Sequence, residues 1–167
     1  MILNSVSKHI ISSIVIVGLI LSFTGCKTTS KPVQESRDVQ NSNYINQKYG
    51  FSLDIPKDFA EDVTVKEEGN IVYFVYKDVQ SLVPDFMAGK VGRIEIYDKN
   101  KYSKTALNQF SEMYNFRYIG ENKSFYFGWA HATDVQIPSN ASNEVKEKFR
   151  KLEGEFEEVI KTFKISN

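Results

Sequence analysis

The sequence predicts an α+β fold in which an antiparallel β-sheet is flanked by helices and followed by a long C-terminal helix. Runs of β-branched and aromatic residues, each of strand length, recur between residues 51 and 132 and are separated by turn-forming residues. An apolar stripe with helical spacing then occupies residues 145–163. A sheet and such a helix bury their apolar sides against each other, which favours one layered domain.

The first half of this domain contains three expected strands. Residues 51–55 place apolar side chains on one face, and Pro56 ends the strand. A short strand is expected over 63–66. Residues 71–76 are almost all β-branched or aromatic, which predicts a central strand covered on both faces. A loop is expected over 79–90.

The next strand alternates cleanly between apolar and polar residues. Over residues 92–97, Ile94 and Ile96 are expected to face the core. The opposite, half-buried face has a charged and aromatic set: Arg93, Glu95 and Tyr97. This set is a candidate binding surface, and the plainer interpretation is a solvated strand face.

Two helices and a hairpin complete the expected elements. Ser103 can cap a helix whose apolar residues recur at spacings of three and four up to Tyr114. Residues 116–120 and 125–132 are expected to form two strands joined by a turn. The stripe of the C-terminal helix consists of Val145, Phe149, Leu152, Phe156, Val159, Ile160 and Phe163. It is too short for a coiled coil and favours packing on a sheet.

The N-terminus has the three parts of an export signal: a polar start, an apolar core over 10–23, and small or uncharged residues before Cys26. As a helix this core would span only about 21 Å of a roughly 30 Å hydrocarbon layer, which disfavours a permanent transmembrane segment. The run LSFTGC over 21–26 resembles the lipobox of bacterial lipoproteins. The resemblance implies a signal peptide over 1–25, removed by signal peptidase II, and a diacylglyceryl group on the sulfur of Cys26.

Lipidation of Cys26 would make the membrane the first partner of this protein. Cys26 is the only cysteine, so it forms no internal disulfide. Two acyl chains suffice for stable anchoring, which predicts the extracytoplasmic face of a bacterial cell membrane, in a one-membrane or a two-membrane envelope. Residues 26–43 contain almost nothing to bury and are expected to form a flexible tether, which leaves a single domain over 44–167.

Composition and motifs exclude several functional classes. The 21 basic and 21 acidic residues balance, which argues against a nucleic-acid partner. Outside the signal, His131 is the only histidine, so a multi-histidine zinc site is excluded. The sequence also contains no phosphate-binding loop, no Gly-x-Ser-x-Gly elbow and no EF-hand. We therefore expect no cofactor, no metal site and no catalytic residue.

A second candidate ligand site lies at the end of the last expected strand. Strand alternation places Trp129 and His131 on one face, where an imidazole beside an indole could accept a ligand or sense pH. Asp134 follows closely and could orient the ring. The plainer interpretation is a half-buried histidine over an aromatic core, with an aspartate that caps a turn.

Two stretches resemble the PsbP-like group: 48–59, KYGFSLDIPKDF, and 156–165, FEEVIKTFKI. Members of the group open with an aromatic strand that runs into proline and an aromatic residue, often Trp where this chain has Phe59. They close with a long helix and a Ser/Thr-Phe-Lys-like tail. The resemblance covers residues 44–167 and implies a PsbP-like α/β/α sandwich with a non-enzymatic binding or assembly function.

The expected function is therefore that of a membrane-anchored extracytoplasmic lipoprotein, a non-catalytic binding module for a protein or an envelope polymer. One alternative is a cell-envelope hydrolase with a site near His131 and Asp134. Another is a structural spacer with neither activity nor partner.

Overall fold

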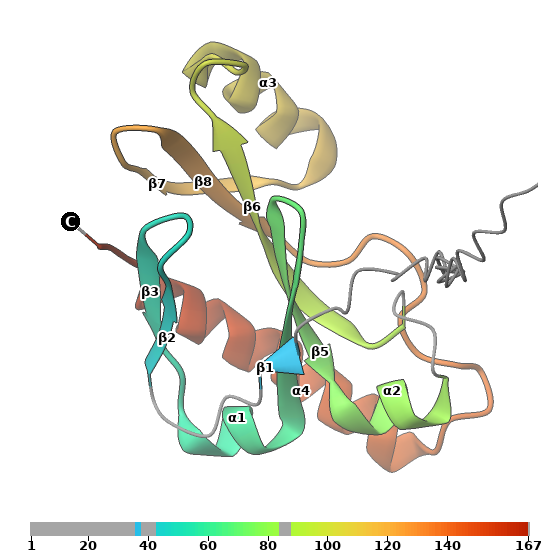
Figure 1. The fold of residues 1–167 in the computed structure, drawn as a ribbon. Coiled ribbons are helices and arrows are strands. Elements are labelled where there is room, and N and C mark those ends of the chain that lie inside the picture. The colour runs from blue at the N-terminus through green and yellow to red at the C-terminus, as the bar shows by residue number, and fades with distance from the viewer. Residues whose placement is uncertain (1–35, 38–42, 84–87, 167) are drawn as a thin grey trace, which may run out of the picture. The chain divides into compact units, whose positions relative to one another are not determined.

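The computed structural model describes residues 36–37, 43–83 and 88–166 (Figure 1). The predicted signal peptide and the predicted lipidation site, Cys26, lie outside these ranges. The elements in chain order are β1 (Ser36–Arg37), β2 (Asn43–Asn46), β3 (Phe51–Asp54), α1 (Lys57–Asp62), β4 (Val63–Glu68), β5 (Ile71–Tyr76), α2 (Lys77–Leu82), β6 (Lys90–Asp98), α3 (Lys104–Tyr114), β7 (Arg117–Glu121), β8 (Phe125–Ala130), α4 (Asn143–Lys161) and β9 (Lys164–Ile165).

The predicted α+β class is confirmed, with the strands divided between two sheets. Every pairing between the described strands is antiparallel. The larger sheet has the order β1-β4-β5-β6-β8-β7, and the smaller has the order β2-β3-β9. The strand expected at 51–55 is β3, which pairs with β2 and with the C-terminal β9.

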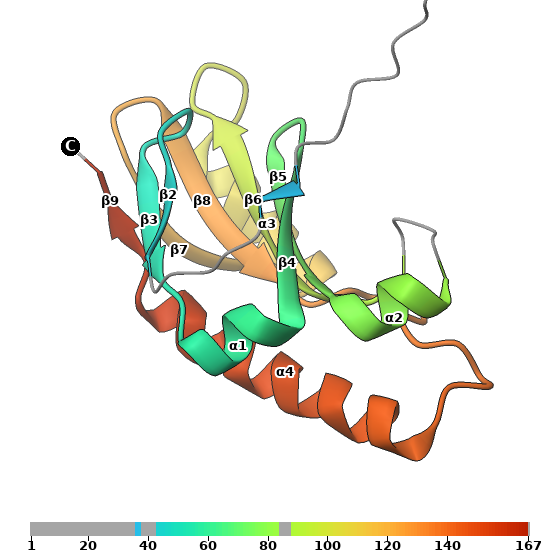
Figure 2. The ribbon, with the colours of Figure 1, turned by 60° about the horizontal axis from the view of Figure 1, so that its bottom comes forward.

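Helix α4 covers one face of the larger sheet, and we call this the inner face (Figure 2). Ile94 and Ile96 of β6 are buried, as predicted. A Cβ atom on Gly92 would lie only 2.0 Å from the ring of Phe156, so glycine is what allows this ring to rest on the strand. The opposite, outer face is covered only in part: β5 is central, but Ile71 and Tyr73 are half-buried.

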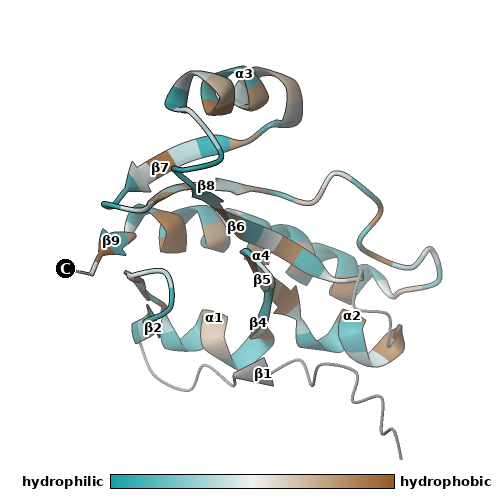
Figure 3. Ribbon diagram, turned by 45° about the horizontal axis from the view of Figure 1, so that its top comes forward, coloured by the Kyte–Doolittle hydropathy of each residue, from teal (hydrophilic) through white to brown (hydrophobic). Residues whose placement is uncertain are grey.

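Helix α4 buries five of the seven residues of its predicted stripe, whereas Val145 is half-buried and Phe163 lies after the end of the helix. Its fully or nearly fully buried residues are Phe149, Leu152, Phe156, Val159 and Ile160. Ser142 caps its N-terminus, where the hydroxyl accepts a hydrogen bond from the Val145 amide at 3.3 Å. Hydrophobic and hydrophilic residues alternate along the helix, as Figure 3 shows. The helix packs on the sheet rather than in a coiled coil.

Helix α3 buries less of its stripe than its spacing suggests. Ser103 caps it as predicted, accepting from the Ala106 amide at 3.2 Å, and Leu107 is buried. Phe110 and Met113, by contrast, are 38% and 68% exposed. The helix packs against β7, which leaves part of the stripe exposed.

Several short elements differ from expectation. Residues 77–82 form α2, where a loop was predicted from residue 79, because Val79 is inserted into the core. Within the predicted tether, Ser36–Arg37 pairs with β4 as β1. The strand expected over 125–132 ends at Ala130. In the described part of the chain, no helix combines the length and apolar character needed to cross a bilayer.

Candidate functional site

Arg93, Glu95 and Tyr97 form a connected ladder on the outer face of β6. The Arg93 Nε donates to Glu95 Oε1 at 2.5 Å, and the Tyr97 hydroxyl donates to the other carboxylate oxygen. Burial, together with the hydrogen bond to Glu95, raises the pKa of Tyr97, so the phenol remains a donor. The Tyr97 ring also meets Tyr102 and Phe116 edge-on. The charges of Arg93 and Glu95 neutralise each other, and Tyr97 is bound to the same carboxylate. The ladder therefore offers no free cation or anion to a ligand.

His131 lies directly after β8, at the inner face. Its ring meets Trp129 and Phe156 edge-on, at centroid distances of 5.1 and 6.1 Å. Its Nδ1 lies 3.0 Å from the Val91 carbonyl, and its Nε2 lies 3.1 Å from Glu157 Oε1. A carbonyl can only accept, so Nδ1 donates to Val91, and the Glu157 carboxylate lies opposite Nε2.

Glu157, rather than Asp134, supplies the carboxylate partner of His131. Asp134 Oδ1 instead accepts from Gln136 Nε2 at 2.7 Å. Gln136 is buried, and its Oε1 accepts from the Lys90 amide at 2.8 Å. Asp134 therefore fixes the loop after β8 to the start of β6. The signal that could have identified Glu157 is its place next to Phe156, at the flank of the buried stripe.

The two candidate sets adjoin but serve opposite faces of the sheet. Arg93 Nη1 donates to the His131 carbonyl at 2.9 Å. In the register of β6 and β8, however, Trp129 is opposite Ile94, whereas Arg93 is opposite Ala130. Trp129 and His131 therefore belong to the contact with α4, and the ladder belongs to the outer face.

The pair His131–Glu157 predicts a pH-dependent contribution to stability. The hydrogen bond from His131 lowers the pKa of Glu157 from its ordinary 4.5; desolvation opposes this shift, and nearby positive charges add to it. A carboxyl with a lowered folded-state pKa stabilises the fold above its unfolded pKa, and this stabilisation is lost as the pH falls through the folded value. We expect Glu157→Gln to be less stable than the wild type at pH 7, and this difference to shrink below pH 4.5. Denaturant unfolding at several pH values measures it.

The matched control is Glu147→Gln, on the same helix. Glu147 is exposed and has no ion pair within the described residues, so its substitution should leave the pH profile almost unchanged. If Glu157→Gln lowered the free energy of unfolding by the same amount at pH 7 and at pH 3, the assigned pairing would be contradicted.

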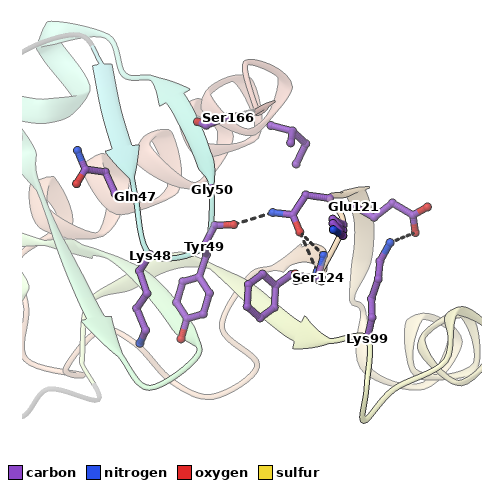
Figure 4. A pocket seen from close by; sticks show the side chains of 12 residues that line it. Gln47, Lys48, Tyr49, Gly50, Lys99, Glu121, Ser124 and Ser166 are labelled. Carbon is purple, nitrogen blue, oxygen red and sulfur yellow. Dashed lines mark hydrogen bonds and ion pairs between the residues drawn. The ribbon is translucent and has the colours of Figure 1, made fainter.

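A surface pocket of about 660 Å³ lies where turns of the two sheets meet (Figure 4). Its lining comes from the β2–β3 turn at 47–50, the β7–β8 turn at 121–125, residues 165–166 and Lys99. This volume lies within the roughly 300–1,000 Å³ that is usual for ligand sites. We call it the junction pocket.

Asn122 organises the junction pocket. Its Oδ1 accepts from two amides of its own turn, those of Ser124 at 2.9 Å and Phe125 at 2.8 Å. Its Nδ2 donates to the Tyr49 carbonyl at 2.8 Å, which ties the turns of the two sheets together (Figure 4). Gly50 has a φ of 72°, a conformation that favours glycine, and a Cβ there would lie 3.2 Å from the Asn122 amide, a tight contact.

The sequence contains little that would reveal this pocket. Asn122 and Tyr49 are 73 residues apart in the chain and meet only after both sheets have formed. Within the described residues, no three His, Cys, Asp or Glu side chains are grouped as metal ligands. Comparison with known protein families, with curated proteins and with solved structures finds no match to this chain.

Proposed function

We propose that the protein is a bacterial lipoprotein whose PsbP-like domain binds a protein or an envelope polymer without catalysing a reaction. A diacylglyceryl group on Cys26 would hold it on the extracytoplasmic face of the cell membrane. The lipobox-like run over 21–26 supports the anchoring, and the antiparallel sheet with its long C-terminal helix is compatible with the resemblance to the PsbP-like group.

The junction pocket is the observation that supports a binding function. It is open at the surface, has the size of a ligand site and is lined by side chains from four separate stretches. Asn122 holds its two turns in place, so a ligand would meet a largely preformed surface. The ladder and the His131 cluster, in contrast, are occupied by contacts within the domain.

The hydrolase alternative receives less support from the geometry. Both ring nitrogens of His131 are engaged, one by the Val91 carbonyl and the other by Glu157. Asp134, its expected partner, is engaged by Gln136. These contacts join α4 and the loop after β8 to the sheet, which is a structural role.

Photo-crosslinking in intact cells tests the proposed binding function. We expect p-benzoylphenylalanine in place of Lys123, at the pocket, to give light-dependent adducts that retard the protein in an immunoblot. The matched control places the same residue at Lys151, on the exposed side of α4, and should give no such adduct. Adducts from both positions alike, or from neither, would contradict a partner at the pocket, and the latter is what the spacer alternative predicts.

A further inference from the structure

The charges around the junction pocket indicate the chemical class of its ligand. Three lysines and one carboxylate line it, so the lining has an excess of two positive charges: Lys48, Lys99, Lys123 and Glu121. The whole chain has a formal net charge of zero, so this excess is local. A concave surface with charges of one sign raises the local concentration of ligands of the opposite sign.

Glu121 does not neutralise the lysines near it. Its Oε2 lies 3.5 Å from Lys99 Nζ and 3.8 Å from the Nζ of Lys104, which stands just outside the pocket. One carboxylate is therefore shared by two ammonium groups. A hydrogen bond with Tyr118, and the charge of Glu121, raise the pKa of Lys104, so it stays protonated at neutral pH.

Among the residues that the structure describes, no carboxylate pairs with the remaining lysines of the lining. Lys48 Nζ donates to the Gly69 carbonyl at 3.3 Å and lies 4.5 Å from the centroid of the Tyr49 ring, contacts that hold the ammonium without cancelling its charge. Lys123 is exposed in the β7–β8 turn and forms no ion pair within the described ranges.

Aromatic rings hold two further ammonium groups in position. Lys99 Nζ lies 4.7 Å from the centroid of Tyr126, and Lys104 Nζ lies 4.7 Å from that of Tyr118. Contacts of this kind restrict long side chains that would otherwise be mobile. Less conformational entropy is then lost when an anion binds between them.

We propose that the junction pocket binds phosphate groups of an anionic envelope polymer, an inference that rests on the proposed binding function. Lysines act as point charges for phosphate, and here several surround a preformed concave surface. A polymer with regularly spaced phosphates would present one group to the pocket and others to Lys104 beside it. Anionic lipid headgroups offer the same phosphate chemistry, and the experiment separates the two sources.

The test is calorimetric titration of the full chain, purified in nonionic detergent, with soluble poly(glycerol phosphate) and with neutral dextran. We expect binding of the phosphate polymer alone. The double variant Lys99→Gln/Lys123→Gln should weaken it about tenfold or more, since each substitution removes a charge-assisted contact. The matched control, Lys57→Gln/Lys151→Gln, removes two exposed lysines from α1 and α4 and should change the affinity less than about twofold.

The remaining outcomes overturn the inference in distinguishable ways. Equal weakening by both double variants would mean attraction of the polymer to any lysine. Binding of dextran as well as the phosphate polymer would overturn the anionic ligand but leave the proposed function standing. Binding of neither polymer, with crosslinks at position 123 still present, would have the same meaning. The protein could instead bind only detergent micelles that contain phosphatidylglycerol, with weaker binding in the Lys99→Gln/Lys123→Gln variant. That result would assign the phosphate to a lipid headgroup. Loss of both crosslinks and binding would remove the proposed function as well.

Discussion

Replacing Phe156 with alanine is expected to lower the free energy of unfolding by about 3–5 kcal/mol, the usual cost of deleting a large buried aromatic side chain. Phe156 is fully buried between α4 and the sheet. Its ring centroid lies 4.9 Å from that of Phe74 and 5.7 Å from that of Trp129. The substitution would leave a cavity under the only long helix of the described domain, and urea unfolding monitored by circular dichroism would measure the loss.

A second substitution tests whether the Phe156 ring packs directly on Gly92. Gly92→Ala alone places a methyl group 2.0 Å from the Phe156 ring and should cost about 1–3 kcal/mol through overpacking. In the Phe156→Ala background the same methyl group enters the cavity, and its cost should fall sharply. Strict additivity in this double-mutant cycle would contradict the assigned contact.

Replacing Cys26 with serine is expected to abolish the proposed lipidation, so that only chains with an uncut signal peptide stay on the membrane. Each buried methylene of an acyl chain contributes about 0.8 kcal/mol to membrane binding, so a cleaved chain without the two proposed acyl chains would lose almost all of its anchoring energy. Serine keeps the size of the side chain but lacks the thiol that is proposed to take the glyceryl group. Labelling of growing cells with an alkyne fatty acid, followed by fractionation, gives the measurement: the wild type should be labelled and sediment with membranes.

The control for this experiment is the precursor. With Cys26→Ser, the uncut signal peptide should raise the apparent mass, so chains that still sediment with membranes can be sorted into uncleaved and cleaved forms. An unlabelled wild type, with a free thiol at position 26, would contradict lipidation directly.

Helix α4 was predictable from the sequence, whereas α2 and β9 were not. Helix α4 repeats its apolar positions over five turns, so the pattern itself specifies the buried side. Helix α2, by contrast, has six residues and a single fully buried one, Val79, which is too little for a periodic signal. Strand β9 has two residues, and it is defined only by its pairing with the edge of β3.

The same contrast applies to the candidate sites. Strand alternation was enough to place Arg93, Glu95 and Tyr97 on one face, because neighbours two apart on a strand always share a side. Their partners depend on how distant segments approach each other. The contact of His131 with Glu157, 26 residues away, and that of Asn122 with Tyr49 arise only from tertiary packing.

The pairing of β3 with β9 has a consequence for the timing of folding. Asp54 and Lys164 are 110 residues apart in the chain and form an ion pair at 2.7 Å across this small sheet. Closing so large a loop is slow, and it cannot begin until residue 164 has been synthesised. The pairing of β3 with β9 is therefore expected to be among the last contacts of the domain to form during synthesis.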